Sequence, residues 1–165
     1  MSPSCLVDTT FVRIERPYLC KWEYFNKNKS DHGFTYQVVV SLGKPFRILD
    51  FSGPFKGSAA DVSVFRATLL ENLEVGEKVM ADRGYWQEER CWTPPIGKLQ
   101  QLTEKQKIQR RKVTRIRQLN ERVIGRLKKW GCLNRRWNHD WELQKLCAQV
   151  AAKLTQLELY YYPIT

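Results

Sequence analysis

The chain has 165 residues, of which 42% are hydrophobic, as is typical of one domain with a single core. Its 28 Lys and Arg residues exceed its 17 Asp and Glu residues, which leaves a formal net charge of +11. Thirteen of the basic residues and a single acid, Glu121, lie between Lys105 and Arg136. A phosphate backbone is the usual partner of such a patch, and a solvated helix face is the alternative.

Other classes of protein are disfavoured by what the sequence lacks. The five cysteines form no C-x-x-C pair and have no nearby pair of histidines, which argues against a zinc site or a disulfide framework. No apolar run reaches the roughly 18 residues needed to span a bilayer, and no secretory signal is visible. We therefore expect an intracellular protein without a membrane partner, in the nucleus of a eukaryote or otherwise in the cytoplasm.

Three β-strands are predicted near the N-terminus, at Cys5–Ile14, Phe34–Leu42 and Pro45–Ser52. All three are rich in β-branched and aromatic residues. The expected breaks between them are His32-Gly33 and Gly43-Lys44. Short connections imply antiparallel pairing, because parallel neighbours need a long crossover.

A helix and another strand are expected next. The S-x-x-D pattern from Ser58 to Asp61 predicts a helix start of the capping-box kind, with the helix continuing to about Leu73. Lys78–Ala81 then reads as a short buried strand that ends at Asp82. Strand, helix, strand implies a right-handed crossover and hence a parallel strand.

The C-terminal part is predicted to be helical after a short strand at Cys91–Thr93. One helix is expected from Leu102 to about Trp130, and a second at Trp141–Leu159. The apolar arc of the first contains Val113, Ile116, Asn120, Ile124 and Leu127, with Glu121 one step past its edge. In the second helix, the expected packing face consists of Leu143, Leu146, Cys147, Val150, Leu154 and Leu157.

This order of elements is that of the ribonuclease-H-like fold, an α/β mixed sheet of three antiparallel strands followed by a helix and a parallel strand, with flanking helices. In such a fold Asp8, Asp82 and Glu121 would form one acidic cluster, because ligands gather at the ends of neighbouring strands. Carboxylates are the hard oxygen ligands that hold two Mg²⁺ ions about 4 Å apart for phosphodiester cleavage.

Each acid also has an ordinary structural interpretation. Asp8 can be a polar residue at a strand end, Asp82 a turn former, and Glu121 the ion-pair partner of Arg117 one turn earlier. The joint placement of the three acids on suitable elements is the stronger indication.

Several strings resemble the DDE superfamily endonuclease domain of PIF/Harbinger and insertion-sequence transposases, over most of the chain. VDTTFVRIERP (Val7–Pro17) is similar to the first-aspartate segment of that family, and MADRGY (Met80–Tyr85) to its second-aspartate turn. GSAADVSVF (Gly57–Phe65) resembles its G-S-x-x-D segment. NERVIGRLKKW (Asn120–Trp130) resembles its glutamate helix, and LCAQVAAKLTQL (Leu146–Leu157) its closing helix.

The resemblance implies a metal-dependent DNA endonuclease or transposase with Asp8, Asp82 and Glu121 as its metal-binding triad. Its cofactors would be two divalent ions, Mg²⁺ or Mn²⁺, and its reactions phosphodiester hydrolysis and strand transfer on transposon ends and target DNA. Arg83, Arg122, Arg126, Lys128 and Lys129 are the candidate phosphate contacts, with a merely solvated face as the alternative. Asp61 matches a further family aspartate, for which the capping role with Ser58 is preferred.

We expect residues 1–165 to form one catalytic domain. Because only seven residues precede Asp8, the N-terminal DNA-recognition region of such transposases is expected to be lacking. A separate recognition protein or domain and a homo-oligomer are further expected partners. The alternative function is a domesticated or decayed derivative that binds DNA or protein without cutting. A cellular ribonuclease of the same fold is a third interpretation.

Overall fold

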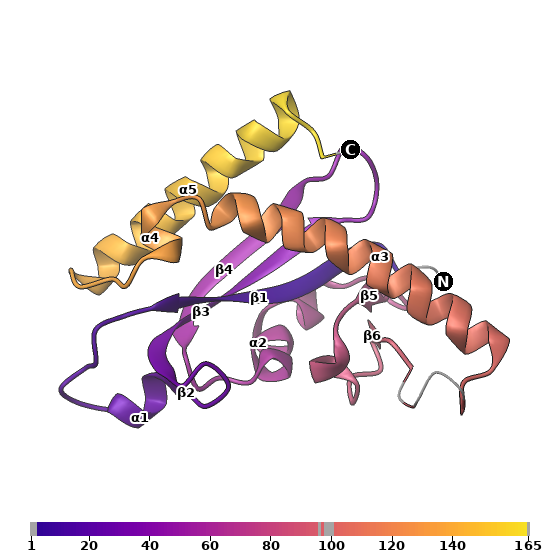
Figure 1. Ribbon diagram of the computed structural model, residues 1–165, viewed down its shortest axis with the longest axis horizontal. Coiled ribbons are helices and arrows are strands. Elements are labelled where there is room, and N and C mark those ends of the chain that lie inside the picture. The colour runs from indigo at the N-terminus through magenta and orange to yellow at the C-terminus, as the bar shows by residue number, and fades with distance from the viewer. Residues whose placement is uncertain (1–2, 96, 98–100, 165) are drawn as a thin grey trace.

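The computed structural model describes residues 3–95, 97 and 101–164. In its mixed β-sheet, strand β1 is an inner strand (Figure 1). β1 (Cys5–Arg13) pairs antiparallel with β3 (Asp31–Ser41) along its whole length. β4 (Ile48–Lys56) pairs antiparallel with the other edge of β3. The predicted antiparallel meander of three strands is therefore confirmed.

Two strand boundaries differ from those expected. β3 begins before Gly33, and a Cβ at that glycine would lie 2.3 Å from the ring of Phe11, so the glycine permits close strand contact and makes no turn. β4 starts and ends later than predicted and runs through Gly53-Pro54. Two short elements, α1 (Lys21–Tyr24) and β2 (Phe25–Asn26), lie in the connection between β1 and β3.

A parallel strand extends the sheet on the other side of β1. α2 (Asp61–Thr68) and the 3-10 turn η1 (Leu70–Asn72) lead to β5 (Val79–Met80), which pairs parallel with β1. β6 (Cys91–Trp92) pairs parallel with β5. The expected helix and parallel strand are confirmed, although the helix ends earlier than Leu73.

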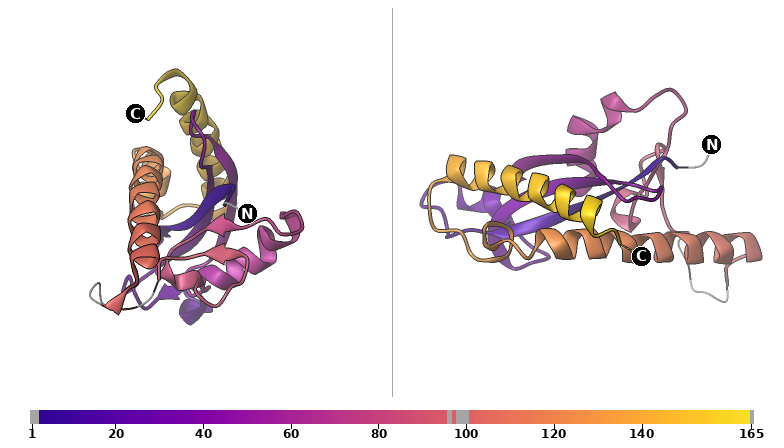
Figure 2. Two further views of the ribbon diagram at one scale, coloured as in Figure 1. Left: turned by 90° about the vertical axis from the view of Figure 1, so that its right-hand side faces the viewer. Right: turned by 90° about the horizontal axis from the view of Figure 1, so that it is seen from above.

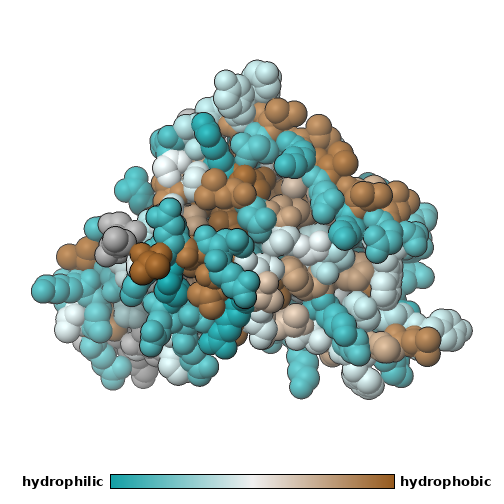
Figure 3. Space-filling view, turned by 180° about the vertical axis from the view of Figure 1, so that it is seen from behind, coloured by the Kyte–Doolittle hydropathy of each residue, from teal (hydrophilic) through white to brown (hydrophobic). Residues whose placement is uncertain are grey.

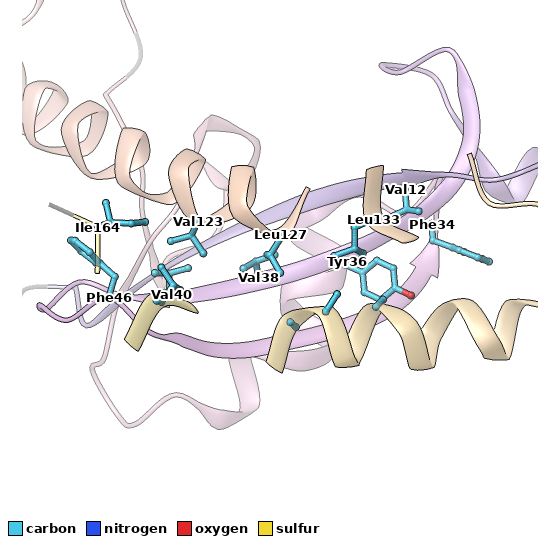
Figure 4. Close-up of a cluster of buried hydrophobic side chains, with 14 of the residues drawn as sticks. Val12, Phe34, Tyr36, Val38, Val40, Phe46, Val123, Leu127, Leu133 and Ile164 are labelled. Carbon is cyan, nitrogen blue, oxygen red and sulfur yellow. The ribbon is translucent and has the colours of Figure 1, made fainter. Parts of the chain in front are cut away.

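Helices cover both faces of the sheet (Figures 1 and 2). α3 (Glu104–Leu127), α4 (Gly131–Asn134) and α5 (Trp141–Tyr161) contribute to the larger core, which Figure 4 shows against β1 and β3. α2 packs on the opposite face, where Val39 belongs to a second cluster. The result is the α/β mixed sheet with flanking helices of a ribonuclease-H-like fold, as predicted.

The buried side of α3 matches the arc read from the sequence. Val113, Asn120, Val123 and Leu127 are its buried residues, and Ile124 packs partly against the same core. Its first turn is closed by a capping box between Thr103 and Gln106.

The packing face predicted for α5 is wrong. Leu146 and Leu157 are 57% and 55% exposed, and a hydrophobic band follows α5 on the surface (Figure 3). The side turned to the sheet instead consists of Gln144, Ala148, Ala151, Ala152, Thr155 and Leu159. Alanines let this helix approach the strands closely, and its polar groups find partners there. Within the part of the chain that the structure describes, neither α5 nor any other helix is long and apolar enough to cross a membrane.

Candidate active site

The candidate site lies at an edge of the sheet where strand pairing is interrupted. The parallel pairing of β1 with β5 involves only Cys5 and Leu6 of β1, and the next backbone partner among the described residues is Trp137, at Arg13 and Ile14. Asp82 lies just beyond the last residue of β5 and is therefore carried to the same edge. This place at the carboxyl end of a parallel strand is where α/β sheets usually bind ligands.

Asp8 points from β1 toward α3. Its Oδ2 accepts a hydrogen bond from Nδ2 of Asn120 at 3.2 Å, and its Oδ1 accepts one from the backbone N–H of Thr9 at 2.8 Å. Burial is the main cause that raises the pKa of Asp8 to about 6, and the nearby Asp82 and Asp61 raise it further. The charged form of Asp8 would thus gain from a nearby cation.

Asp82 is held by the turn that follows it. Its Oδ1 accepts a hydrogen bond from the backbone N–H of Gly84 at 2.7 Å and caps the 3-10 turn η2 (Arg83–Tyr85). A Cβ on Gly84 would lie 3.0 Å from Oδ1 of Asp82 and 3.8 Å from Oδ2 of Asp61. Glycine therefore lets the backbone pass close beside the Asp82 carboxylate, with the Asp61 carboxylate at ordinary contact distance.

Asp61 belongs to this acidic cluster, and its predicted capping box with Ser58 is wrong. The N-cap of α2 is Ala60, without a side-chain cap, and the Ser58 hydroxyl donates to the carbonyl of Glu23. Oδ1 of Asp61 accepts a hydrogen bond from the Thr9 hydroxyl at 2.8 Å. As the first residue of the helix, Asp61 is free to reach across to β1. Burial, and then the charge of Asp82, raise its pKa against the effect of Thr9.

Tyr85 lies beneath the aspartates. The side chain is fully buried, with its ring edge-on to Phe65, and its hydroxyl has no hydrogen-bond partner. Burial raises the pKa of Tyr85, and Asp61, Asp8 and Asp82 raise it further, so the hydroxyl is near all three carboxylates. Sequence reasoning assigned no role to Tyr85, because an aromatic residue after a turn is usually part of the core.

Glu121 lies on an exposed part of α3, one residue after Asn120. No ion pair joins it to Arg117 in the described part of the chain, so its expected structural partner is not found there. Arg117 instead lowers the pKa of Asp8, and its buried Nε has no hydrogen-bond partner. The convergence of Glu121 with the aspartates stays a prediction.

One protein family matches most of the chain. The family model described as DDE superfamily endonuclease matches residues 7–156, a span that includes Asp8, Asp61, Asp82 and Glu121. The chain belongs to this family. No curated protein and no solved structure matches it. Membership supports a nuclease of the transposase type with DNA as its substrate.

DDE superfamily endonucleases use divalent metal ions in general. Within residues 3–95, 97 and 101–164, no three His, Cys, Asp or Glu side chains stand in an arrangement that could hold an ion. The donor chemistry nevertheless fits, because aspartate oxygens are the ligands that Mg²⁺ and Mn²⁺ prefer. Two buried oxygens at the site, Oδ1 of Asn120 and the Tyr85 hydroxyl, also have no hydrogen-bond partner.

Arg126, Lys128 and Lys129, which are predicted to contact DNA, make contacts within the endonuclease domain. Arg126 donates to the carbonyl of Tyr162 at 2.6 Å, and Lys129 pairs with Glu158 at 3.2 Å. Lys128 donates to the carbonyls of Phe11 and Leu133. These contacts join the three basic side chains to other parts of the fold. A role for them in DNA binding stays a prediction.

Exposed basic side chains lie elsewhere on the endonuclease domain. Arg83 is exposed on the turn directly after Asp82, and Arg122 is exposed on α3. The N-terminal half of α3, which extends past the sheet (Figure 2), carries four more: Lys105, Arg111, Lys112 and Arg115. Its one acid is Glu104, which is paired with Lys107. This half of α3 therefore presents a concentrated positive surface.

Proposed function

We propose that this chain cuts DNA phosphodiester bonds using two divalent ions, Mg²⁺ or Mn²⁺, held by Asp8, Asp82 and Glu121. The proposal includes attack of the freed 3′-hydroxyl on a phosphodiester of target DNA, which joins the two strands and releases the 3′-hydroxyl of the cut target strand. The observation that supports it is that Asp8 and Asp82 lie near the same sheet edge, where the charge of Asp82 acts on Asp8, in a chain of the DDE superfamily endonuclease family. When bound, such ions activate the attacking oxygen and stabilise the leaving oxygen.

The residues around the aspartates have distinct tasks in this proposal. Asn120 and the backbone N–H of Thr9 each hold one oxygen of Asp8 and so fix the orientation of that carboxylate. Glu121, on the next position of α3, would reach the same ions by a change of rotamer, because glutamate is long enough to bridge from a helix. Arg117, whose charge lowers the pKa of Asp8, would contact the phosphate that is to be cut.

The DNA backbone is proposed to run from Arg83 and Arg122 at the acidic site along the N-terminal half of α3. Support comes from the exposed row of Lys105, Arg111, Lys112 and Arg115, which lacks neighbouring acids other than Glu104. Such a row binds phosphates without reading bases. Recognition of particular transposon ends would then require a separate domain or protein, and a homo-oligomer would hold two ends together.

Nicking of supercoiled DNA with Mg²⁺ or Mn²⁺ tests the proposal. Asp82→Asn and Glu121→Gln remove one ligand charge each, and Glu89→Gln is the matched control on an exposed acid beyond the site. We expect the two site variants to lose at least about a hundredfold in rate, by analogy with the loss of one group that stabilises transition-state charge. The control should keep the wild-type rate.

Two results would contradict the proposal. Equal nicking by all four proteins would show that the acids are not catalytic. Absence of nicking by the wild type, together with DNA binding, would favour the non-cutting derivative. Preferential cleavage of RNA–DNA hybrids would instead indicate a ribonuclease.

A further inference from the structure

Asp61 begins α2 but does not cap it. Its carboxylate neither caps α2 nor forms an ion pair with a described residue, and it is held toward the site by the Thr9 hydroxyl. The same Thr9 donates its backbone N–H to Asp8. Thr9 therefore orients two carboxylates that approach the edge of β1 from opposite faces of the sheet.

The negative charges of the three aspartates act on one another, and Arg117 and Lys29 oppose this repulsion in part. Each of Asp8 and Asp61 is affected by the charge of Asp82, and Asp8 is also affected by Asp61. Beside them lies the unpaired and fully buried hydroxyl of Tyr85. An unsatisfied hydroxyl in such a place costs free energy unless a ligand or ordered water completes the site.

We propose that Asp61 is a fourth acidic ligand of the divalent-cation site, with the Tyr85 hydroxyl as a positioning group that bonds a cation-bound water. The inference rests on the proposed function and adds a residue to it. It explains why Asp61 points toward β1, why Asp61 and Asp82 both lie near Gly84, and why a buried hydroxyl is left without a protein partner.

The test is direct Mn²⁺ binding to the full chain, measured by electron paramagnetic resonance, for wild type and Asp61→Asn. We expect the variant to lose one bound ion or to bind Mn²⁺ at least about tenfold more weakly. Without metal, Asp61→Asn should melt at a higher temperature than the wild type, because one of three mutually repelling charges is removed. Unchanged Mn²⁺ binding with a lower melting temperature would mean that Asp61 is only structural.

Two further variants separate charge from hydrogen bonding. Thr9→Val removes the hydroxyl that holds Asp61 but keeps the carboxylate, so it should weaken Mn²⁺ binding less than Asp61→Asn does. An equal loss in both would contradict a ligand role. Tyr85→Phe should also weaken Mn²⁺ binding, and it serves as the deciding variant if Asp61→Asn does not fold; unchanged affinity would then overturn the proposal.

Failure of this inference can be told apart from failure of the proposed function. If Asp82→Asn lowers Mn²⁺ affinity and Asp61→Asn does not, the fourth ligand is wrong and the site of Asp8, Asp82 and Glu121 stands. If the wild type binds no Mn²⁺ at all, both proposals fail. Asp50→Asn on β4, remote from the site, is the control and should bind as the wild type does.

Discussion

The two long helices that cover the same face of the sheet use opposite kinds of residues to do so. α3 turns its apolar arc inward, so that Val123 and Leu127 are fully buried. α5 turns its alanines and several polar residues inward and leaves its leucines exposed. A periodic apolar stripe thus predicts that a helix has an apolar face, but it does not decide which face the fold covers.

Polar contacts explain the orientation of α5. The Tyr36 hydroxyl donates to Oε1 of Gln144, whose Nε2 donates to the carbonyl of Cys132 at 3.0 Å. Further along the helix, the indole N–H of Trp130 donates to the hydroxyl of Thr155 at 3.0 Å. A helix that presented its leucines to the sheet would leave these buried groups unpaired, and larger side chains would keep it farther from the strands.

Truncation of one leucine on each helix should give the largest difference. Leu127→Ala on α3 removes a fully buried side chain and should lower the free energy of unfolding by about 2–5 kcal/mol. Leu157→Ala on α5 removes an exposed side chain and should change it by less than about 0.5 kcal/mol. Urea unfolding measures both. Comparable losses would show that the α5 stripe is packed in solution.

The polar inner face of α5 gives the next largest effect. Gln144→Leu leaves the Tyr36 hydroxyl and the Cys132 carbonyl without their partner, and should cost about 1–3 kcal/mol. Gln149→Leu is the matched control, because Gln149 is exposed on the same helix. A neutral effect of the first variant would mean that hydrogen bonds do not set the orientation of α5.

The exposed faces of α3 and α5 should differ in their affinity for duplex DNA. Lys112→Gln or Arg115→Gln on α3 should weaken binding, and the slope of log affinity against log salt should fall by about 0.9 for each phosphate that the variant no longer neutralises. Lys153→Gln on α5 removes the same charge from an exposed position and should leave the slope unchanged. Fluorescence anisotropy at several salt concentrations distinguishes the helices. Equal slopes for all three would place the DNA elsewhere.

Lys128 lies at the C-terminal end of α3 and should make the stability of the fold depend on pH. Burial is the main cause that lowers the pKa of Lys128 from 10.5 to about 8, and Lys29 and Arg13 lower it further. The unfolded chain binds this proton more tightly, so Lys128 should make the fold more stable as pH rises from 8 toward 10.5. Thermal melts should show this rise in the wild type and in Lys129→Met. If stability still rose with pH in Lys128→Met, Lys128 would not be the source of the pH dependence.

Much of the fold could be predicted because its signals are local. The strands around Val38 and Val79 and the apolar arc of α3 follow from residue type and period, and the order of these elements indicates the ribonuclease-H-like topology. Asp82 and Glu121 stand in distinctive strings, so the sequence alone points to an acidic site. Their contacts with metal or DNA stay predictions.

Tertiary structure alone decided the rest, because those features depend on which groups become buried together. Ser58 and Asp61 match a capping pattern, yet the hydroxyl of Thr9 draws Asp61 to the sheet edge. The leucines of α5 match a packing pattern, yet the hydrogen bonds of Gln144 favour the opposite face. Local sequence determined which residues can form an acidic site, and long-range pairing across β1 decided that Asp61 lies beside Asp8 and Asp82.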